Sequence, residues 1–467
     1  MREFKLLING KLVSGAARLD VINPATEEVL AEAPRADRAQ LDEAIAAAKA
    51  ALPAWSAKPI RERGALLVRL ANALEARGDE FARLLTREQG KPLSEAQWEI
   101  DFTIDIIRYY ATLDLPDEVL KEDATRRIVR QHIPLGVVAA IVPWNFPMIL
   151  LVIKVAPALL AGDTLVSKPA PTTPLTTLWF GELCGEILPA GVINIIVDHN
   201  DLGDALSSHA DVAKVAFTGS TTTGKQVMAS AAGTLKRLTL ELGGNDAAIV
   251  LDDVDPIEIA PKLFVAATMN AGQLCLGAKR LYVHESQYDQ ICEELGRLAR
   301  ETVVDDGLKH GTQMGPLQNK AQFEKVKGFL EDAKRNGKIV AGGEVLNRKG
   351  YFIQPTIVRD ISDDARLVTE EQFAPIVPVL RYSDVDDAIA RANDSDYGLA
   401  GTVWAKDLDR AFQVAAKIET GTVWINKFLD VSPDISFGGT KQSGIGTELG
   451  QDGLEAFTQV RIINMAK

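Results

Sequence analysis

The sequence feature that most constrains the fold is a repeated alternation of continuously apolar segments with helical ones, beginning near Leu135. It predicts strands over residues 136–142, 163–168, 192–197 and 212–217, with helices between them. Strands that are apolar on both faces are typical of a parallel sheet covered by helices on both sides. Such sheets bind dinucleotides beyond the carboxyl ends of their strands. We therefore expect an α/β fold whose first sheet is Rossmann-like.

A second α/β unit is predicted in the following part of the chain, where the alternation starts again. Strands are expected over residues 247–251 and 280–284, and helices over residues 257–270 and 286–300. We expect this unit to form a separate catalytic domain.

Two further segments complete the predicted architecture. Residues 119–133 alternate and carry many charges, so they are too polar for either core, and a closing strand is expected over residues 457–464. We expect the two segments to form a small β arm that is exchanged between subunits.

The amino-terminal region is predicted to be mostly helical. It opens with a hairpin over residues 6–13 that turns at Asn9-Gly10, and it continues with a helix capped by Asp37. Further amphipathic helices are expected over residues 61–77 and from residue 93 to about residue 113. These helices contain no residues that indicate chemistry, so we expect them to be scaffold.

Composition and charge exclude several classes of function. The net charge of −13 comes without a basic stripe, which argues against nucleic acid or anionic membranes as partners. The five histidines are scattered, so no metal site is expected. The three cysteines form no CxxC pair, no signal peptide is evident, and the most apolar run, residues 146–160, is shorter than a membrane span. We expect a cytoplasmic protein of roughly three domains.

One glycine-containing turn is a candidate phosphate site. Residues 217–225, Phe-Thr-Gly-Ser-Thr-Thr-Thr-Gly-Lys, follow a predicted strand and open a helix, where N–H groups and the helix dipole attract a pyrophosphate. The spacing matches the GxxxxGK of a P-loop, but Gln226 stands where a P-loop has Ser or Thr. On local sequence alone, an ordinary strand-to-helix turn is an equal alternative.

A stiff loop follows the first of the apolar strands. Residues 143–147, Pro-Trp-Asn-Phe-Pro, place an amide between two prolines, each of which fixes its φ angle and lacks an N–H donor. Such a loop would hold the Asn145 side chain still as a hydrogen-bond donor. A simple strand-terminating turn is an equal alternative.

Two potentially reactive side chains lie in short glycine-marked stretches. Glu241 begins Glu-Leu-Gly-Gly-Asn, and Cys275 ends Gly-Gln-Leu-Cys, 34 residues further along. A thiol nucleophile and a carboxylate base are the groups needed to form a thioester and then hydrolyse it. Taken singly, a cysteine is more often a small buried hydrophobic residue, and a glutamate is more often a surface or ion-paired group.

Together the motifs form a set that extends over nearly the whole chain. They are, in order, Pro-Trp-Asn-Phe-Pro, Lys-Pro at 168–169, Phe-Thr-Gly-Ser, Glu-Leu-Gly-Gly-Asn, Gly-Gln-Leu-Cys, Glu-Gln-Phe-Ala-Pro at 371–375 and Phe-Gly-Gly at 437–439. In these motifs the chain closely resembles the aldehyde dehydrogenase superfamily. The resemblance implies oxidation of an aldehyde to a carboxylic acid with NAD or NADP, by a homodimer or homotetramer.

The resemblance also implies a division into three parts. The cofactor-binding domain would comprise residues 1–117 and 136–244, and the catalytic domain residues 245–435. The oligomerisation arm would comprise residues 118–135 and 447–467.

Five catalytic residues are implied by the resemblance. Cys275 would add to the aldehyde as a thiolate, and its backbone N–H and the Asn145 side chain would hold the oxyanion. Glu241 would activate the water that opens the thioester, and relatives that pass the acyl group to coenzyme A generally lack this base. Lys154 and Glu448 match a proton relay, with a buried ion pair or a solvated charge as the alternative.

The resemblance likewise implies the cofactor contacts. Lys168 and Glu371 would bind ribose hydroxyls, and Gly219 and Ser220 would lie near the pyrophosphate. The other implied contacts are Trp144 and Phe373, which would wall the site, together with Ile141, Pro143, Gly224 and Leu242.

The chain departs from the family pattern at Pro171. Many relatives that prefer NAD carry a ribose-binding glutamate at this place, after Lys-Pro and a small residue. Without that carboxylate a 2′-phosphate would not be repelled, so we expect NADP to be accepted alongside NAD.

The substrate pocket implied by the resemblance is mostly apolar. Its walls would be Phe146, Leu150, Ile153, Leu274, Leu276 and Phe437, with the rest of the loop over residues 428–437. These residues favour uncharged aliphatic or aromatic aldehydes, although Asp430 and Asp434 could attract a cationic aminoaldehyde. Two other functions remain as alternatives. One is a reductase linked to coenzyme A or phosphate through the same thioester, and the other is an inactive relative with a structural or binding role.

Overall fold

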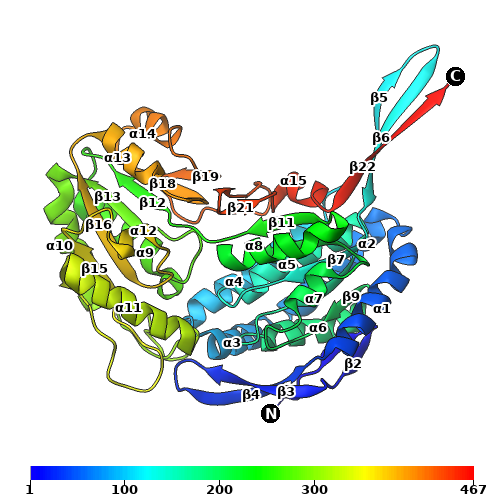
Figure 1. The fold of residues 1–467 in the computed structure, drawn as a ribbon, viewed down its shortest axis with the longest axis horizontal. Helices are drawn as coiled ribbons and strands as arrows, with labels where there is room; N and C mark the ends of the chain where they lie inside the picture. Colours follow the sequence, from blue (N-terminus) through cyan, green and yellow to red (C-terminus); the bar gives the residue numbers. More distant parts are fainter. Residues whose placement is uncertain (1) are drawn as a thin grey trace.

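The computed structural model describes residues 2–467, and it consists of two α/β bodies with a β ribbon that projects from one of them (Figure 1). The first body is built around an eight-stranded sheet and the second body around a seven-stranded sheet. The predicted α/β fold with two parallel-sheet units is confirmed.

The sheet of the first body has the strand order β2-β1-β9-β8-β7-β10-β11-β21, and its strands from β9 to β11 are parallel. The chain runs from β7 through β8 to β9 and then returns to β10 on the other side of β7. Ligands of open α/β sheets bind where the strand order reverses in this way. The strands are β1 (Leu6–Ile8), β2 (Lys11–Val13), β7 (Val137–Ile141), β8 (Thr164–Lys168), β9 (Ile193–Ile195), β10 (Val212–Thr218), β11 (Arg237–Glu241) and β21 (Gly444–Ile445).

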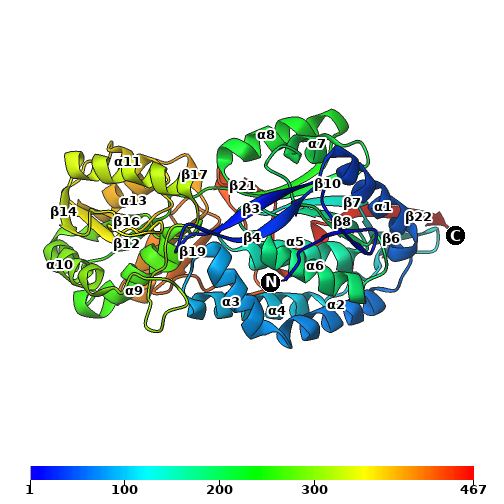
Figure 2. The ribbon, with the colours of Figure 1, turned by 90° about the horizontal axis from the view of Figure 1, so that it is seen from below.

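Helices cover both faces of this sheet (Figure 2). One face is covered by α1 (Arg38–Ser56), α7 (Gly203–Ser208) and α8 (Thr221–Ala231), which ends in the short helix η1 (Ala232–Thr234). The other face is covered by α5 (Pro147–Ala161) and α6 (Leu175–Ile187), with α2 (Ile60–Glu75), α3 (Gly78–Gln89) and α4 (Leu93–Tyr110) packed outside them. α15 (Gly450–Glu455) also packs on α5.

The elements predicted in the amino-terminal region are present, and one further helix was not predicted. Asp37 caps α1 by accepting a hydrogen bond from the Gln40 N–H at 2.9 Å, and Asn9-Gly10 forms the turn between β1 and β2. The helix predicted over residues 61–77 ends at Glu75, and α3 was missed. Only two residues separate α2 from α3, and no proline marks the break.

The second body has a seven-stranded sheet with the order β14-β15-β16-β13-β12-β18-β19, in which only β14 is antiparallel. A separate apolar cluster fills each face. The strands are β12 (Ala247–Val250), β13 (Arg280–His284), β14 (Lys338–Ala341), β15 (Thr356–Arg359), β16 (Ile376–Tyr382), β18 (Ala400–Trp404) and β19 (Thr422–Ile425). The helices are α9 (Pro256–Thr268), η2 (Met269–Gly272), α10 (Glu285–Glu301), α11 (Lys320–Asn336), α12 (Arg366–Thr369), α13 (Val385–Asn393) and α14 (Leu408–Ala415).

Three strands form the projecting ribbon (Figure 1). β6 (Arg126–Pro134) pairs with β5 (Glu118–Glu122) on one side and with β22 (Thr458–Ala466) on the other. Segments that the sequence predicted to form one arm therefore lie side by side. Several large apolar side chains of the ribbon are exposed, namely Val119, Leu120, Val460, Ile462, Ile463 and Met465.

Two smaller sheets connect the bodies. The hairpin of β3 (Ala17–Asn23) and β4 (Glu28–Arg35) extends from the first body to the second (Figure 2). At its turn the carbonyl of Pro24 accepts a hydrogen bond from the Tyr351 N–H at 3.0 Å. The other sheet pairs β17 (Tyr397–Gly398) with β20 (Thr440–Lys441).

Within residues 2–467, no helix is both long and apolar enough to cross a membrane. The same described part of the chain contains no group of three or more His, Cys, Asp or Glu side chains that could hold a metal ion.

Candidate active site

The parallel strands of the first body bring the predicted site residues to one edge of its sheet. In the strand register, Ile141 at the end of β7 lies beside Lys168 at the end of β8 and beside Phe217 near the end of β10. Thr218, the last residue of β10, lies beside Glu241, the last residue of β11. The side chains and loops that follow these strands therefore converge at the carboxyl edge of the sheet.

An apolar cavity of about 80 Å³ lies at this edge. All six predicted wall residues line it, together with Cys275, Glu241, Asn145 and Glu448. Leu429 and Val431 of the predicted loop 428–437 also line it. The lining residues that sequence reasoning missed are Trp98, Phe102, Ile149 and Leu449. Trp98 and Phe102 belong to α4 and stack at 5.6 Å between ring centroids, so α4, which was expected to be scaffold, forms part of the cavity wall.

Glu241 is buried in this cavity, with 5% of its surface exposed. Neither of its carboxylate oxygens has a hydrogen-bond partner of normal geometry among the described residues, although the thiol of Cys275 lies close enough to lower its pKa. Burial raises the pKa of Glu241 to about 8, and the negative charge of Glu448 adds to the increase. A buried carboxyl that faces a thiol and has a pKa near neutrality is typical of a group that exchanges protons in a reaction.

Cys275 follows a short segment in a strained backbone conformation. Asn270 and Ala271 have φ angles of 51° and 54°, and Gly272 has a φ angle of 70°. A Cβ atom at Gly272 would lie 2.4 Å from the carbonyl carbon and oxygen of Ala374, so only glycine fits there. Strain of this kind persists only where the surroundings fix the backbone, and it is frequent at functional sites.

The environment of Cys275 favours the neutral thiol over the thiolate. Burial raises the pKa of the thiol well above its ordinary value, and the negative charge of Glu241 raises it further. Lys279 opposes this increase, and its Nζ donates to the carbonyl of Cys275 at 2.5 Å. Because the thiolate is the nucleophilic form, Cys275 needs a base before it can react.

Asn145 is buried, and its side chain is held by the segment that leads to Cys275. The Asn145 Nδ2 donates to the backbone carbonyl of Gln273 at 3.2 Å. The backbone carbonyl of Asn145 accepts from Nδ2 of Asn270 at 3.1 Å. An Asn amide has two N–H donors. One is used on Gln273, and the side chain also lines the cavity that contains the thiol.

Lys154 and Glu448 form a buried ion pair beside the cavity. Lys154 Nζ donates to Glu448 Oε1 at 2.8 Å and to Thr218 Oγ1 at 2.7 Å. The side chains expose 0% and 5% of their surface, so neither charge is solvated. The structure therefore excludes solvated charges at these two positions, and the proton relay stays a prediction.

A groove of about 940 Å³ runs along the same edge of the sheet. Six of the ten predicted cofactor residues line it, namely Ile141, Pro143, Trp144, Lys168, Gly219 and Ser220. Ala170, Pro171 and Thr172 form part of its wall. Lys168 donates from Nζ to Asp198 Oδ1 at 2.7 Å.

The groove has the features that a dinucleotide requires. Ser220 caps α8, an 11-residue helix, and the N–H groups and dipole of that helix face the groove wall that Ser220 and Thr223 form. Thr172 Oγ1 and Ser207 Oγ lie buried in the wall, and no described residue is their hydrogen-bond partner. Unpaired buried hydroxyls are suited to ribose or base edges.

The four other predicted cofactor residues lie outside the walls of this groove. Gly224 contacts Leu242, whose side chain fills the space where a Cβ of residue 224 would be. Phe373 packs edge-on against Trp144, with ring centroids 5.4 Å apart. Glu371 accepts a hydrogen bond from the Gly244 N–H at 3.0 Å.

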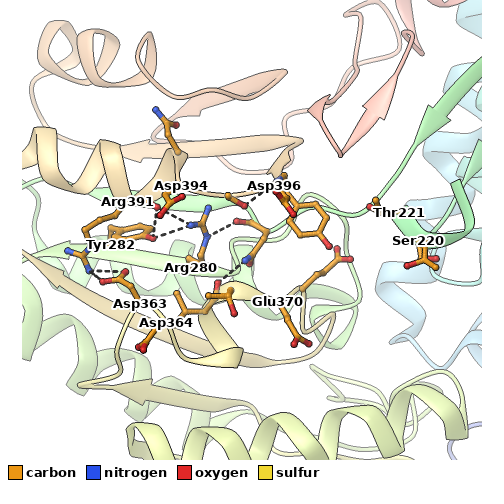
Figure 3. Close-up of a pocket in the computed structure, with 18 of the residues that line it drawn as sticks. Ser220, Thr221, Arg280, Tyr282, Asp363, Asp364, Glu370, Arg391, Asp394 and Asp396 are labelled. Atoms are coloured by element: carbon orange, nitrogen blue, oxygen red, sulfur yellow. Dashed lines mark hydrogen bonds and ion pairs between the residues drawn. The ribbon is translucent and has the colours of Figure 1, made fainter. Parts of the chain in front are cut away.

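Glu371 lines a second cleft of about 920 Å³, between the start of α8 and the second body (Figure 3). Its carboxylates outnumber its cations, and the cationic groups are already engaged. Arg391 pairs with Asp363 at 2.9 Å, and Arg280 donates to the carbonyl of Ala392 at 2.9 Å. This acidic cleft suits phosphates less well than the groove does.

Comparison with known proteins identifies the family. The model of the aldehyde dehydrogenase family matches residues 12–463. The chain belongs to this family. It is 40% identical to a phenylacetaldehyde dehydrogenase from Pseudomonas fluorescens, and the alignment covers 99% of this chain and 96% of the relative.

Solved structures agree with this assignment. An NAD⁺ complex of an aldehyde dehydrogenase from Bacillus cereus superposes with a TM-score of 0.97 and 38% identity, covering 100% of this chain and 97% of that one. An NADP-dependent enzyme from Escherichia coli superposes with a TM-score of 0.97 and 37% identity. The match covers 100% of this chain and 98% of that one. The protein is therefore an NAD- or NADP-dependent oxidoreductase that oxidises aldehydes to carboxylic acids.

Proposed function

We propose that the apolar cavity is the aldehyde site and that Cys275, Glu241 and Asn145 perform the reaction in it. The observation that carries this proposal is that the three side chains line one cavity at the carboxyl edge of the first sheet. The first body would bind the cofactor in the 940 Å³ groove, and the second body would supply Cys275.

The first half of the reaction forms a thioester. Since the pKa of the thiol is raised, Glu241 in its ionised form takes the thiol proton, and the sulfur bonds to the carbonyl carbon of the aldehyde. The carbonyl oxygen becomes an alkoxide, which accepts hydrogen bonds from the Asn145 side chain and the Cys275 N–H. NAD or NADP, when bound, supplies the acceptor for the hydride that leaves this carbon. Cys275 then carries the acyl group.

The second half hydrolyses the thioester. Glu241 first releases the thiol proton to solvent and then takes a proton from the attacking water. The bond between carbon and sulfur breaks with its electron pair on sulfur, the thiolate takes the proton back from Glu241, and the carboxylic acid leaves. With a pKa of about 8, this carboxyl accepts and releases protons near neutral pH. The Lys154–Glu448 pair adjoins the cavity, and Glu448 would accept the proton from Glu241 on its way to solvent.

The walls of the cavity support an uncharged aliphatic or aromatic aldehyde as substrate. Apart from Asn145, Cys275 and the two carboxylates, Glu241 and Glu448, its lining residues are apolar. The two aspartates considered from the sequence do not line the cavity. Asp430 pairs with Lys427 at 2.7 Å, and Asp434 accepts a hydrogen bond from Ser432. These contacts weaken the aminoaldehyde alternative.

We propose that NADP is accepted alongside NAD. Pro171 and its neighbours Ala170 and Thr172 place no carboxylate on their part of the groove. Asp204 is the one carboxylate among the groove's lining residues, and it accepts a hydrogen bond from Ser230. Lys168 lines the same groove, where Asp198 offsets its positive charge. A 2′-phosphate is therefore not repelled at the position of Pro171.

We further propose that the ribbon of β5, β6 and β22 joins subunits of a homodimer or homotetramer. Its exposed apolar side chains, including Ile462 at 51% and Met465 at 50%, support burial in a partner. The three cysteines are unpaired, which is consistent with the cytoplasmic location expected from the sequence.

The direct test is formation of reduced cofactor by the purified protein. NAD and NADP are supplied separately with uncharged aliphatic, aromatic, acidic and amino aldehydes, without coenzyme A or phosphate. We expect turnover of the uncharged aldehydes with both cofactors, and none in the C275A variant. Turnover that required coenzyme A or phosphate would favour an acylating reductase, and equal activity of C275A would refute the role of Cys275.

A further inference from the structure

A buried ion pair lies directly behind the loop that carries Asn145. Lys91, between α3 and α4, and Glu99, in α4, have a Nζ–Oε2 distance of 2.5 Å, and both side chains are 0% exposed. Neither residue lines the apolar cavity. The free energy needed to remove two charges from water can exceed their Coulomb attraction unless further hydrogen bonds are made. The further bonds of this pair all go to the loop and to the helix that follows it.

Lys91 contacts two neighbouring residues of the loop. Its Nζ donates to the carbonyl of Asn145 at 2.9 Å and lies 3.6 Å from the ring centroid of Phe146. Both residues line the cavity, one with its amide and the other with its aromatic ring. A single ammonium group therefore fixes the backbone beneath the amide and the orientation of the ring beside it.

Glu99 supplies the cap that α5 lacks. The residue at the cap position of α5 is Phe146, which has no side-chain acceptor for the free N–H groups of the first turn. Glu99 Oε1 accepts from the Met148 N–H at 2.9 Å and from the Ile149 N–H at 3.4 Å. Because α5 begins two residues after Asn145, this carboxylate fixes the other end of the loop.

A second anchor ties the same carbonyl to the Cys275 segment. Asn270 donates from Nδ2 to the carbonyls of Asn145 at 3.1 Å and Gln273 at 3.2 Å. Its Oδ1 accepts from Nε2 of Gln89 at 3.0 Å, and Gln89 Oε1 accepts from the Lys91 N–H at 2.9 Å. The ion pair, the amide donor and the thiol segment thus form one hydrogen-bonded network.

We propose that Lys91 and Glu99 are positioning residues that aim the Asn145 amide at the developing oxyanion. The inference rests on the proposed role of Asn145 as an oxyanion donor. Without Lys91, the carbonyl of Asn145 loses its charged donor and the amide moves away from the aldehyde oxygen. Because oxyanion donors act in the transition state, this displacement lowers the rate of the chemical step and leaves aldehyde binding nearly unchanged.

The test is a double-mutant cycle of K91M and N145A, read as the rate of the reduced-cofactor burst with NAD and an uncharged aldehyde. We expect K91M to slow the burst by about 10- to 100-fold. N145A should slow it on the order of 10²–10³-fold. The burst rates of K91M/N145A and N145A should agree within about twofold, because K91M acts only through Asn145. K236M is the matched control, because Lys236 is another buried lysine whose Nζ donates to backbone carbonyls, those of His209 and Val212.

A second variant separates positioning from folding stability. K91M leaves Glu99 buried without a cation, whereas K91M/E99Q removes both charges and should recover the lost thermal stability. We expect the K91M/E99Q burst to remain slow, since the donor to the Asn145 carbonyl is still missing. Alkylation of Cys275 by iodoacetamide should proceed at the wild-type rate in both variants.

Three outcomes would overturn the proposal. The pair would be purely structural if K91M and N145A slowed the burst independently of each other. The same conclusion would follow if K91M/E99Q recovered both the thermal stability and the burst rate of the wild type. A wild-type burst in N145A would remove the oxyanion role of Asn145 and this inference with it. The proposed thioester chemistry would still stand in that case if C275A were inactive.

Discussion

Lys154 Nζ donates a hydrogen bond to Glu448 Oε1 at 2.8 Å although 294 residues separate the two in the chain. Glu448 lies in the loop before α15, and Lys154 lies in the middle of α5. The pair therefore joins the carboxyl-terminal segment to the first body and also places two charges beside the cavity that contains Glu241.

Replacing Lys154 with methionine should destabilise the fold. K154M leaves the Glu448 carboxylate buried without a cation, and breaking a buried pair in this way typically costs about 3–5 kcal/mol. Urea unfolding measures the loss in the free energy of unfolding. K154M/E448L, which removes both charges, is the matched variant and should be clearly more stable than K154M. Unchanged stability of K154M would show that the pair contributes little.

The steady-state rate should increase as the pH rises through about 8. The pKa of Glu241 is raised to about 8, so below that pH the carboxyl is mostly neutral and does not act as a base. The Glu448 charge raises this pKa and the Lys154 charge lowers it. E448Q should therefore shift the pH profile to lower pH, and K154M should shift it to higher pH. Profiles that coincide for all three proteins would show that Glu241 does not control the rate.

Placing a carboxylate at Pro171 should change cofactor preference. P171E puts a negative charge on the groove wall, where it repels a 2′-phosphate and can accept hydrogen bonds from ribose hydroxyls. We expect kcat/KM for NADP to fall by at least about tenfold relative to NAD, while P171A, the matched control, keeps the wild-type ratio. If P171E left the ratio unchanged, the ribose would not lie against this residue.

A charge on the ribbon should dissociate the oligomer. Ile462 is 51% exposed in β22, and a carboxylate there would be buried against a partner at high cost. Analytical ultracentrifugation of I462D should show a smaller species than the wild type. I257D is the matched control, because Ile257 is 60% exposed but lies on α9, away from the ribbon. An unchanged sedimentation coefficient for I462D would place the subunit contact elsewhere.

The strands and several helix ends could be predicted because their signals are local. The strand predicted over residues 136–142 is apolar on both faces, and Asp37 has the side chain that a helix cap requires. The boundary between α2 and α3 was missed because Ala76 keeps a right-handed helical conformation and only Arg77 leaves it, without a proline. A helical pattern that continues across such a break looks uninterrupted.

The cavity was predicted where a family motif marks its residues and missed elsewhere. Trp98 and Phe102 lie one helical turn apart on α4, a pattern equally typical of an ordinary core-facing helix. Lys91 and Glu99 were missed for a different reason. Charged residues are usually solvated, and only the packed structure shows that both are buried and directed at the Asn145 loop.

The most direct measurement is mass spectrometry of E241Q after a single turnover with an uncharged aldehyde and NAD. Without Glu241 the thiol loses its proton only to solvent, so reduced cofactor should appear slowly and stop at about one equivalent. The acyl group should then remain on Cys275, because no base activates the water that would remove it. The predicted result is an acyl adduct on the Cys275 peptide, absent in C275A/E241Q. Sustained turnover without an adduct, or an adduct on Cys184 or Cys292 instead, would contradict the assignment of Cys275 and Glu241.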